Sequence, residues 1–111
     1  MAYRTLTLAA DSAGTEFFTV NRRRDAPYYT GTFLIGGTWG GGTVAWKLSS
    51  DNGTTLRPLK DETGIAMTSN SDDTWNVTLG NGSTNTKNLK VFLVLSGSTN
   101  PNILVELFDN N

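Results

Sequence analysis

The sequence contains no cysteine and no histidine. Without cysteine there is no disulfide bond, no thiolate metal site and no cysteine nucleophile. Without histidine the chain lacks the most common general base, the most common metal ligand and the usual pH-sensitive side chain. Catalytic triads built on histidine and zinc sites built on histidine or cysteine are excluded. We therefore expect a protein that is not an enzyme, with no catalytic residues, no metal and no cofactor.

The sequence also lacks an excess of charge of one sign and any long apolar run. Nine basic and ten acidic side chains give a formal net charge of −1, whereas nucleic-acid binding normally needs a surplus of positive charge. The longest apolar run, Val91–Leu95, is far too short to cross a bilayer, and the first fourteen residues lack the apolar segment of a signal peptide. We expect neither a nucleic-acid nor a membrane partner, and synthesis in a cytoplasm.

What the chain does contain is typical of β-structure. Threonine, serine, asparagine and glycine are abundant, a mixture that favours strands joined by tight turns and disfavours helices. A chain of 111 residues can bury a hydrophobic core that needs no disulfide bonds or metal ions to be stable. We therefore expect one domain spanning residues 1–111.

Apolar and polar residues alternate with a period of two along much of the chain, which places alternate side chains on one face of a sheet. Trp46 and Trp75 fall on apolar faces of this kind, and we expect both in the core. The segment Leu89–Leu95 is apolar on both faces, which predicts a central strand or one beneath a partner. The pattern predicts an all-β, antiparallel, jelly-roll-like β-sandwich of about eight strands, at residues 4–10, 16–20, 28–35, 43–49, 64–68, 74–79, 89–95 and 103–108.

Five glycines surround Trp39 in the stretch GGTWGGG, residues 36–42. Phosphate-binding and dinucleotide-binding loops need other spacings and a helix that begins at the loop, whereas a predicted strand follows here. The glycines instead supply the positive φ angles of a turn between consecutive strands. Trp39 then either folds back over the end of the sandwich, which we favour, or is exposed and available to a partner.

The segment GTFLIGGTWGGGTVAWKLSSDNGTTLRPL, residues 31–59, resembles a hairpin pattern of small virion-associated β-proteins of tailed phages. Its parts are a strand, G-T-W/F-G-G-G-T-V, an alternating strand, S-x-D-N/G-G-T-T and a Pro-Leu step. With its length and its lack of histidine and cysteine, the chain resembles more narrowly the capsid decoration proteins, also called staple or cement proteins, of epsilon-type Salmonella phages. That resemblance implies a jelly-roll-like sandwich on the capsid exterior, which stabilises contacts between major capsid protein subunits and touches neighbouring copies of itself.

Two further groups are candidate partner-binding residues beside Trp39. Arg22, Arg23 and Arg24 lie between two predicted strands and could pair with carboxylates of an acidic partner, or simply form a solvated loop. Tyr28 and Tyr29 are neighbours at the start of a predicted strand, so one should be buried and the other should point outward as an interface anchor.

Acidic residues give no convincing site. The pairs Asp61–Glu62 and Asp72–Asp73 lack supporting catalytic groups, and Asp51–Gly53 lacks the ligand spacing of a calcium loop. Two other functions remain open. One is a carbohydrate-binding module, in which Trp39 and one of Tyr28 or Tyr29 would form a glycan platform, because the fold alone does not separate the two roles. The other is a tail or baseplate component of the same virion.

Overall fold

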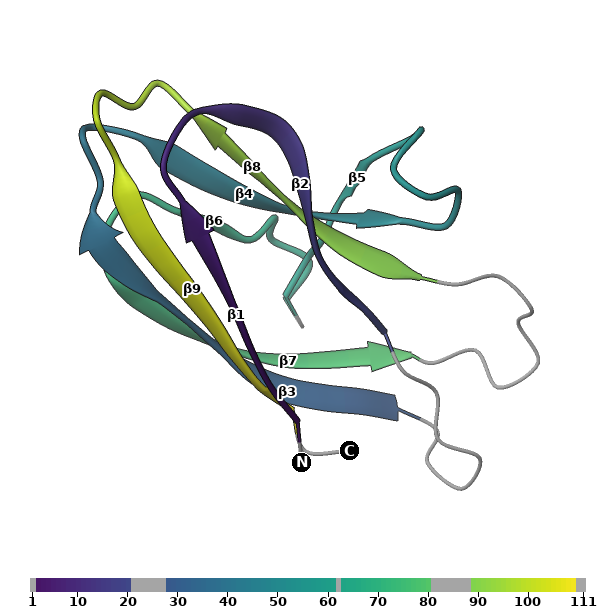
Figure 1. Ribbon diagram of the computed structural model, residues 1–111. Coiled ribbons are helices and arrows are strands. Elements are labelled where there is room, and N and C mark those ends of the chain that lie inside the picture. Colours follow the sequence, from purple (N-terminus) through teal and green to yellow (C-terminus); the bar gives the residue numbers. More distant parts are fainter. Residues whose placement is uncertain (1, 21–27, 62, 81–88, 110–111) are drawn as a thin grey trace.

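The computed structural model describes residues 2–20, 28–61, 63–80 and 89–109, without the side chains of Ala2, Tyr28, Tyr29, residues 78–80 and Asp109. This part of the chain contains strands and turns but no helix, and therefore no helix that could span a membrane. The strands (Figure 1) are β1 (Ala2–Leu8), β2 (Ser12–Thr19), β3 (Tyr28–Thr38), β4 (Thr43–Ser49), β5 (Arg57–Pro58), β6 (Thr68–Ser69), β7 (Asp73–Gly80), β8 (Lys90–Ser96) and β9 (Asn102–Asp109).

The strands pair as one long two-stranded ribbon that is rolled up. From the chain ends inward, β1 pairs with β9, β2 with β8, β3 with β7 and β4 with β5, all antiparallel. Rolling the ribbon brings β9 against β3 and β8 against β4. The result is sheet A, in the order β1-β9-β3-β7, and sheet B, in the order β2-β8-β4-β5. This is a jelly-roll strand order, so the predicted antiparallel sandwich is confirmed.

The core lies between the two sheets and is mostly aliphatic and aromatic. Trp46 of β4 and Phe33 of β3 stack face to face across it, with ring centroids 4.5 Å apart and an interplanar angle of 5°. Phe17 and Phe18 of β2 pack around this pair. The predicted core position of Trp46 is confirmed, since it is 1% exposed. Its buried Nε1 finds no hydrogen-bond partner among the described residues, an arrangement that costs stability.

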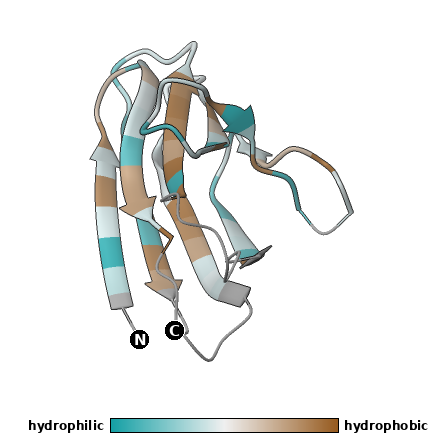
Figure 2. Ribbon diagram, turned by 90° about the vertical axis from the view of Figure 1, so that its right-hand side faces the viewer, coloured by the Kyte–Doolittle hydropathy of each residue, from teal (hydrophilic) through white to brown (hydrophobic). Residues whose placement is uncertain are grey.

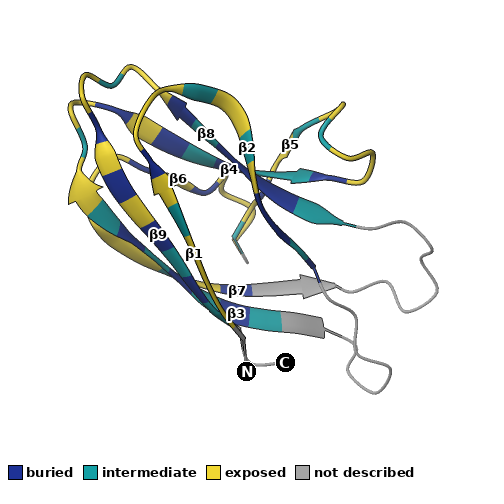
Figure 3. Ribbon diagram, in the orientation of Figure 1, coloured by how far each residue is buried: buried dark blue, intermediate teal, exposed yellow. Residues whose placement is uncertain are grey.

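The predicted alternation is visible along the strands as bands of opposite hydropathy and burial (Figures 2 and 3). In β9, Ile103, Val105 and Leu107 are fully buried between the sheets, while the intervening side chains face outward. Trp75 of β7 is partly buried against the core and donates from Nε1 to Ser69 Oγ at 2.9 Å.

The edge of sheet B beside β4 differs from the prediction. The expected strand at 64–68 is wrong, because β5 and β6 pair with β4 at separate positions along the same edge and the chain leaves that edge between them. Within this excursion Lys60 forms an isolated bridge with Ala66. Leu59 and Met67, at its base, are buried at 4% and 2% exposure. One interrupted edge strand therefore counts as two, which accounts for nine strands where about eight were expected.

The GGTWGGG segment is not a hairpin. Its first three residues extend β3 to Thr38, where they pair with β9. β4 begins at Thr43 and belongs to the opposite sheet. The connection is therefore a corner between the sheets, unlike the hairpin pattern that segment 31–59 resembles.

Candidate binding surfaces

The corner between β3 and β4 is closed by a tight turn. Gly42 N donates to the carbonyl of Trp39 at 2.9 Å, and the central residues Gly40 and Gly41 have φ angles of +58° and +79°. Two positive φ angles are the geometry of a type I′ turn, which glycine adopts without steric cost. The sequence-based interpretation of these glycines as turn residues is confirmed.

Trp39 is folded back against the end of the core, where it is half-buried. Its Nε1 donates to Asp72 Oδ1 at 3.0 Å, and Gly37 N donates to the same oxygen at 3.1 Å. These two hydrogen bonds, that from Trp39 above all, hold the pKa of Asp72 below its ordinary value. Asp72 therefore fixes the indole to the segment that precedes β7, and the polar edge of Trp39 is used inside the molecule.

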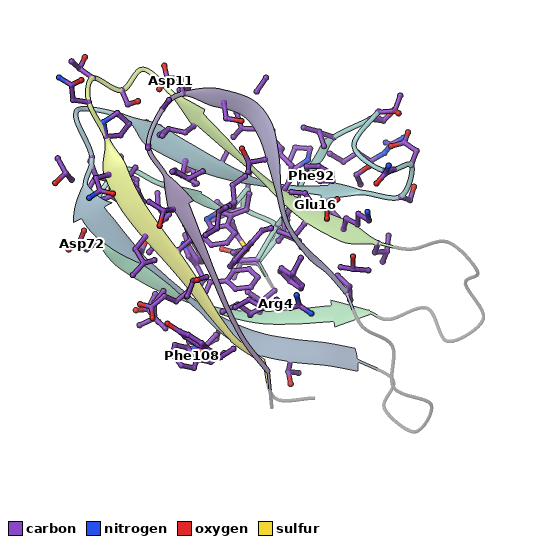
Figure 4. All side chains as sticks on the ribbon, in the orientation of Figure 1. Arg4, Asp11, Glu16, Asp72, Phe92 and Phe108 are labelled. Carbon is purple, nitrogen blue, oxygen red and sulfur yellow. The ribbon has the colours of Figure 1, made fainter. Side chains whose placement is uncertain are left out.

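The same end of the sandwich is tied together by two more contacts. Asp11 Oδ1, in the turn between β1 and β2, accepts hydrogen bonds from the backbone N–H and the hydroxyl of Ser98, in the turn between β8 and β9. Thr99 N donates to the carbonyl of Gly40 at 3.0 Å. Asp11 and Asp72 are both labelled at this end in Figure 4. Hydrogen bonds therefore connect the turns at this end to one another.

Of the other predicted site residues, the structure describes only the backbone of Tyr28 and Tyr29. Tyr28 and Tyr29 begin β3 at the opposite end from Trp39, paired with Gly80 and Leu79 of β7, and their side chains lie outside the described part. Arg22, Arg23 and Arg24 lie wholly outside the described residues. Their partner-binding role therefore stays a prediction.

The acidic residues considered in the sequence that the structure describes accept hydrogen bonds within the protein. Asp61 Oδ1 accepts from the backbone N–H groups of Thr63 and Ile65, at 2.9 and 3.1 Å, and from the Thr63 hydroxyl. Asp73 Oδ1 accepts from Thr74 N at 2.8 Å. Within the described ranges, acidic side chains do not gather in groups of three that could hold a metal ion.

The outward face of sheet A was not among the predicted sites. Register places its side chains in rows that cross the four strands. One row is Tyr3, Phe108, Thr32 and Asn76, and the next is Thr5, Glu106, Leu34 and Thr74. The third contains Thr7, Leu104 and Gly36, beside the carboxylate of Asp72. Alternation along β9 places Leu104, Glu106 and Phe108 on one side. The rest of the face depends on pairing between strands that are distant in sequence, which local patterns do not specify.

Two pairs of polar side chains on this face are hydrogen-bonded to each other. Tyr3 donates its hydroxyl to Glu106 Oε2 at 2.6 Å, and this hydrogen bond is the main cause that raises the pKa of Tyr3. The rings of Tyr3 and Phe108 lie 4.8 Å apart between centroids. Phe108 is labelled in Figure 4, on the side of sheet A that faces away from sheet B. Thr32 donates to Asn76 Oδ1 at 3.0 Å.

The outward face of sheet B is partly covered by the chain itself. Phe92 of β8 points outward yet is only 7% exposed, because the connection between β4 and β5 lies over it, with Gly53 and Leu56 close by. Lys90 Nζ binds Glu16 Oε1 at 3.0 Å and Asn52 Oδ1 at 2.8 Å, which ties the same connection to β2 and β8. The segment 89–95 is therefore apolar on its outer side because the connection between β4 and β5 lies over it.

Comparison with known proteins finds no family model, no curated protein and no solved structure that matches this chain.

Proposed function

We propose that this protein is a structural component of a tailed-phage virion that binds the outer surface of the head and stabilises contacts between major capsid protein subunits. The observation that carries the proposal is the jelly-roll strand order, which places the virion-protein-like segment 31–59 at the corner between two sheets. Jelly rolls are common among viral capsid domains, and the resemblance of that segment supplies the narrower assignment.

The mechanism under this proposal is passive. A rigid sandwich binds a site that exists only on the assembled shell and so stabilises the assembled state by mass action. The cross-bonded turns around Asp11, Asp72 and Trp39 fit such a role, because a preformed surface loses little conformational entropy on binding. Contacts between neighbouring copies would add avidity.

A carbohydrate-binding module is the second candidate, because the same fold also occurs in lectins. A glycan platform needs aromatic rings with open polar groups beside them. The indole N–H of Trp39 is instead bonded to Asp72, and the structure does not place Tyr28 or Tyr29 beside Trp39. These contacts favour the structural role for Trp39, and a glycan panel tests the alternative.

The direct test uses the phage whose genome encodes the chain. In purified virions we expect the protein to co-sediment with heads, at a copy number in fixed proportion to the major capsid protein. Heads from a deletion mutant should assemble but release DNA at a lower temperature, and added purified protein should restore the wild-type temperature. Co-purification with tails alone would support a baseplate component instead, and equal heat resistance with and without the protein would contradict the stabilising role.

A further inference from the structure

The outer faces of the two sheets differ in what covers them. Sheet B carries its own cover over Phe92, supplied by the connection between β4 and β5. On sheet A, Tyr3 is 55% and Leu104 41% exposed, and the described segments leave this face open, as the exposed bands along β1 and β9 show (Figure 3). Exposed large apolar side chains on a flat strand surface mark an interaction site when they gather in one place.

The charges on this face have one sign. Within the described part of the face the charged side chains are Glu106 and, at its rim, Asp72, both acidic. Arg4 lies on the opposite side of β1 from Tyr3, in register with the buried Leu107. The other described basic residues lie on sheet B or beside its edge, at Lys47, Arg57, Lys60 and Lys90.

This charge pattern argues against a second copy docked on the same face. In such a dimer the two-fold axis would bring acidic faces together, and like charges across an interface cost free energy. A partner with arginine or lysine side chains opposite Glu106 and Asp72 would instead form charge-assisted hydrogen bonds.

The hydrogen bonds that polar side chains on this face make with each other favour a protein partner over a glycan. A sugar is recognised through several free donors and acceptors beside an open ring. Here the Tyr3 hydroxyl and Glu106 bind each other, as do Thr32 and Asn76, and Tyr3 lies against the ring of Phe108. An aromatic pair whose adjoining polar groups already bind each other, beside exposed apolar atoms, suits the centre of a protein–protein interface.

We infer that the outer face of sheet A, built around Tyr3, Leu104, Glu106 and Phe108, is the surface through which this protein docks on its partner. Its complement is a flat protein surface that presents apolar side chains toward Leu104 and the Tyr3–Phe108 pair and basic side chains toward Glu106. The inference rests on the proposed function, under which that partner is the outer surface of the major capsid protein.

The test compares opposite charges at one exposed apolar position on each side of the molecule. Leu104→Lys and Leu104→Glu change the face itself. Ile65→Lys and Ile65→Glu are the matched controls, because Ile65 is 65% exposed in the excursion beside sheet B. Each variant is first checked by thermal melting, and its affinity is then measured for purified heads of the deletion phage. Glu106→Gln, which keeps an acceptor for Tyr3, is measured over a salt series.

We expect Leu104→Lys to weaken binding at least about tenfold, as for an interface residue of appreciable energy. Leu104→Glu should bind at least about threefold more tightly than Leu104→Lys, since the partner is basic. Both Ile65 variants should stay within about twofold of the wild type because they lie outside the interface. Glu106→Gln should weaken binding and make it less sensitive to salt.

The outcomes separate the two proposals. Failure of the wild-type protein to bind heads overturns the proposed function and this inference together. Wild-type binding that Leu104→Lys and Glu106→Gln leave unchanged overturns the assignment of the face alone. Tighter binding by Leu104→Lys than by Leu104→Glu would show that the partner surface is not basic. Loss of binding in the Ile65 variants alone would show that the interface lies on the side of sheet B instead.

Discussion

Gly40 and Gly41 have the same backbone requirement but different surroundings. Both have positive φ angles, which cost an L-residue about 1–2 kcal/mol. A Cβ on Gly40 would lie 2.1 Å from the carbonyl oxygen of Thr99, whereas one on Gly41 would meet nothing closer than 3.9 Å. The hydrogen bond from Thr99 to Gly40 depends on this close approach, so only Gly40 is needed for the contact between the two turns.

The first prediction compares alanine at these two positions. Gly41→Ala should lower the free energy of unfolding by about 1 kcal/mol, from backbone strain alone. Gly40→Ala should lower it by about 3 kcal/mol or more, because the turn at Thr99 must also move. Urea unfolding measures both. Equal losses would show that the approach of Thr99 to Gly40 contributes nothing to stability.

Among the strands, those specified by their own side chains were predictable and those specified by a neighbour were not. β4 and β9 alternate strongly and β8 is a nearly continuous apolar run, and the structure confirms all three. β2 begins at Ser12 rather than Glu16, because Ser12 and Thr15 both pair with β8. The small residues Ala13 and Gly14 lie in the register shift between them. The division into β5 and β6 follows from the exposed edge of β4 and leaves no periodic signal in the sequence.

The candidate surfaces likewise include parts with a local sequence signal and parts that depend on contacts between distant segments. The turn at GGTWGGG has a local signal in its glycines, and the folded-back Trp39 follows from the size of its apolar ring. Its partner Asp72 is 33 residues away in sequence and had no such signal. The outer face of sheet A needed the pairing of β9 with both β1 and β3, which local patterns do not specify.

A second prediction concerns the cover over β8. Phe92→Ala should lower the free energy of unfolding by about 3 kcal/mol and speed hydrogen exchange in the connection between β4 and β5, which would lose the ring beneath Gly53. Val94→Ala is the control, since Val94 lies on the same face of β8 and is only half-buried. It should cost about 1 kcal/mol and leave exchange in that connection unchanged. Unaltered exchange in Phe92→Ala would mean that polar contacts, such as that of Lys90 with Asn52, hold the connection without the ring.

Across the whole molecule, carboxylates hold the turns. The pKa of Asp51 is lowered to about 2, first by the Thr55 N–H and then by the Ser49 hydroxyl. Hydrogen bonds also lower the pKa values of three more carboxyls, within the same turn at Asp61 and from distant segments at Asp11 and Asp72. A group whose pKa is lower in the folded state stabilises that state when it is ionised, and the stabilisation is lost as the pH falls through the folded pKa.

The third prediction is therefore a loss of stability in acid. From the ordinary aspartate pKa of 3.8 down to about 2, the melting temperature should fall steadily, with each exposed group contributing modestly because water screens it. Asp51→Asn should lower the melting temperature at neutral pH and flatten its decline over this interval. Melting temperatures measured from pH 6 to pH 2 provide the check, and a curve that is flat below pH 4 in the wild type would contradict it.

The nested pairing also determines how the molecule responds to mechanical force. Ala2 lies opposite Asp109 in the register of β1 and β9, so the chain enters and leaves the sandwich at one corner (Figure 1). Tension applied between the two ends would load the β1–β9 hydrogen bonds one after another and peel the strands apart from that corner. Tension applied through the face of sheet A would be shared by four strands at once. A sandwich attached by its face would therefore withstand pressure from inside a shell better than one tethered by its ends.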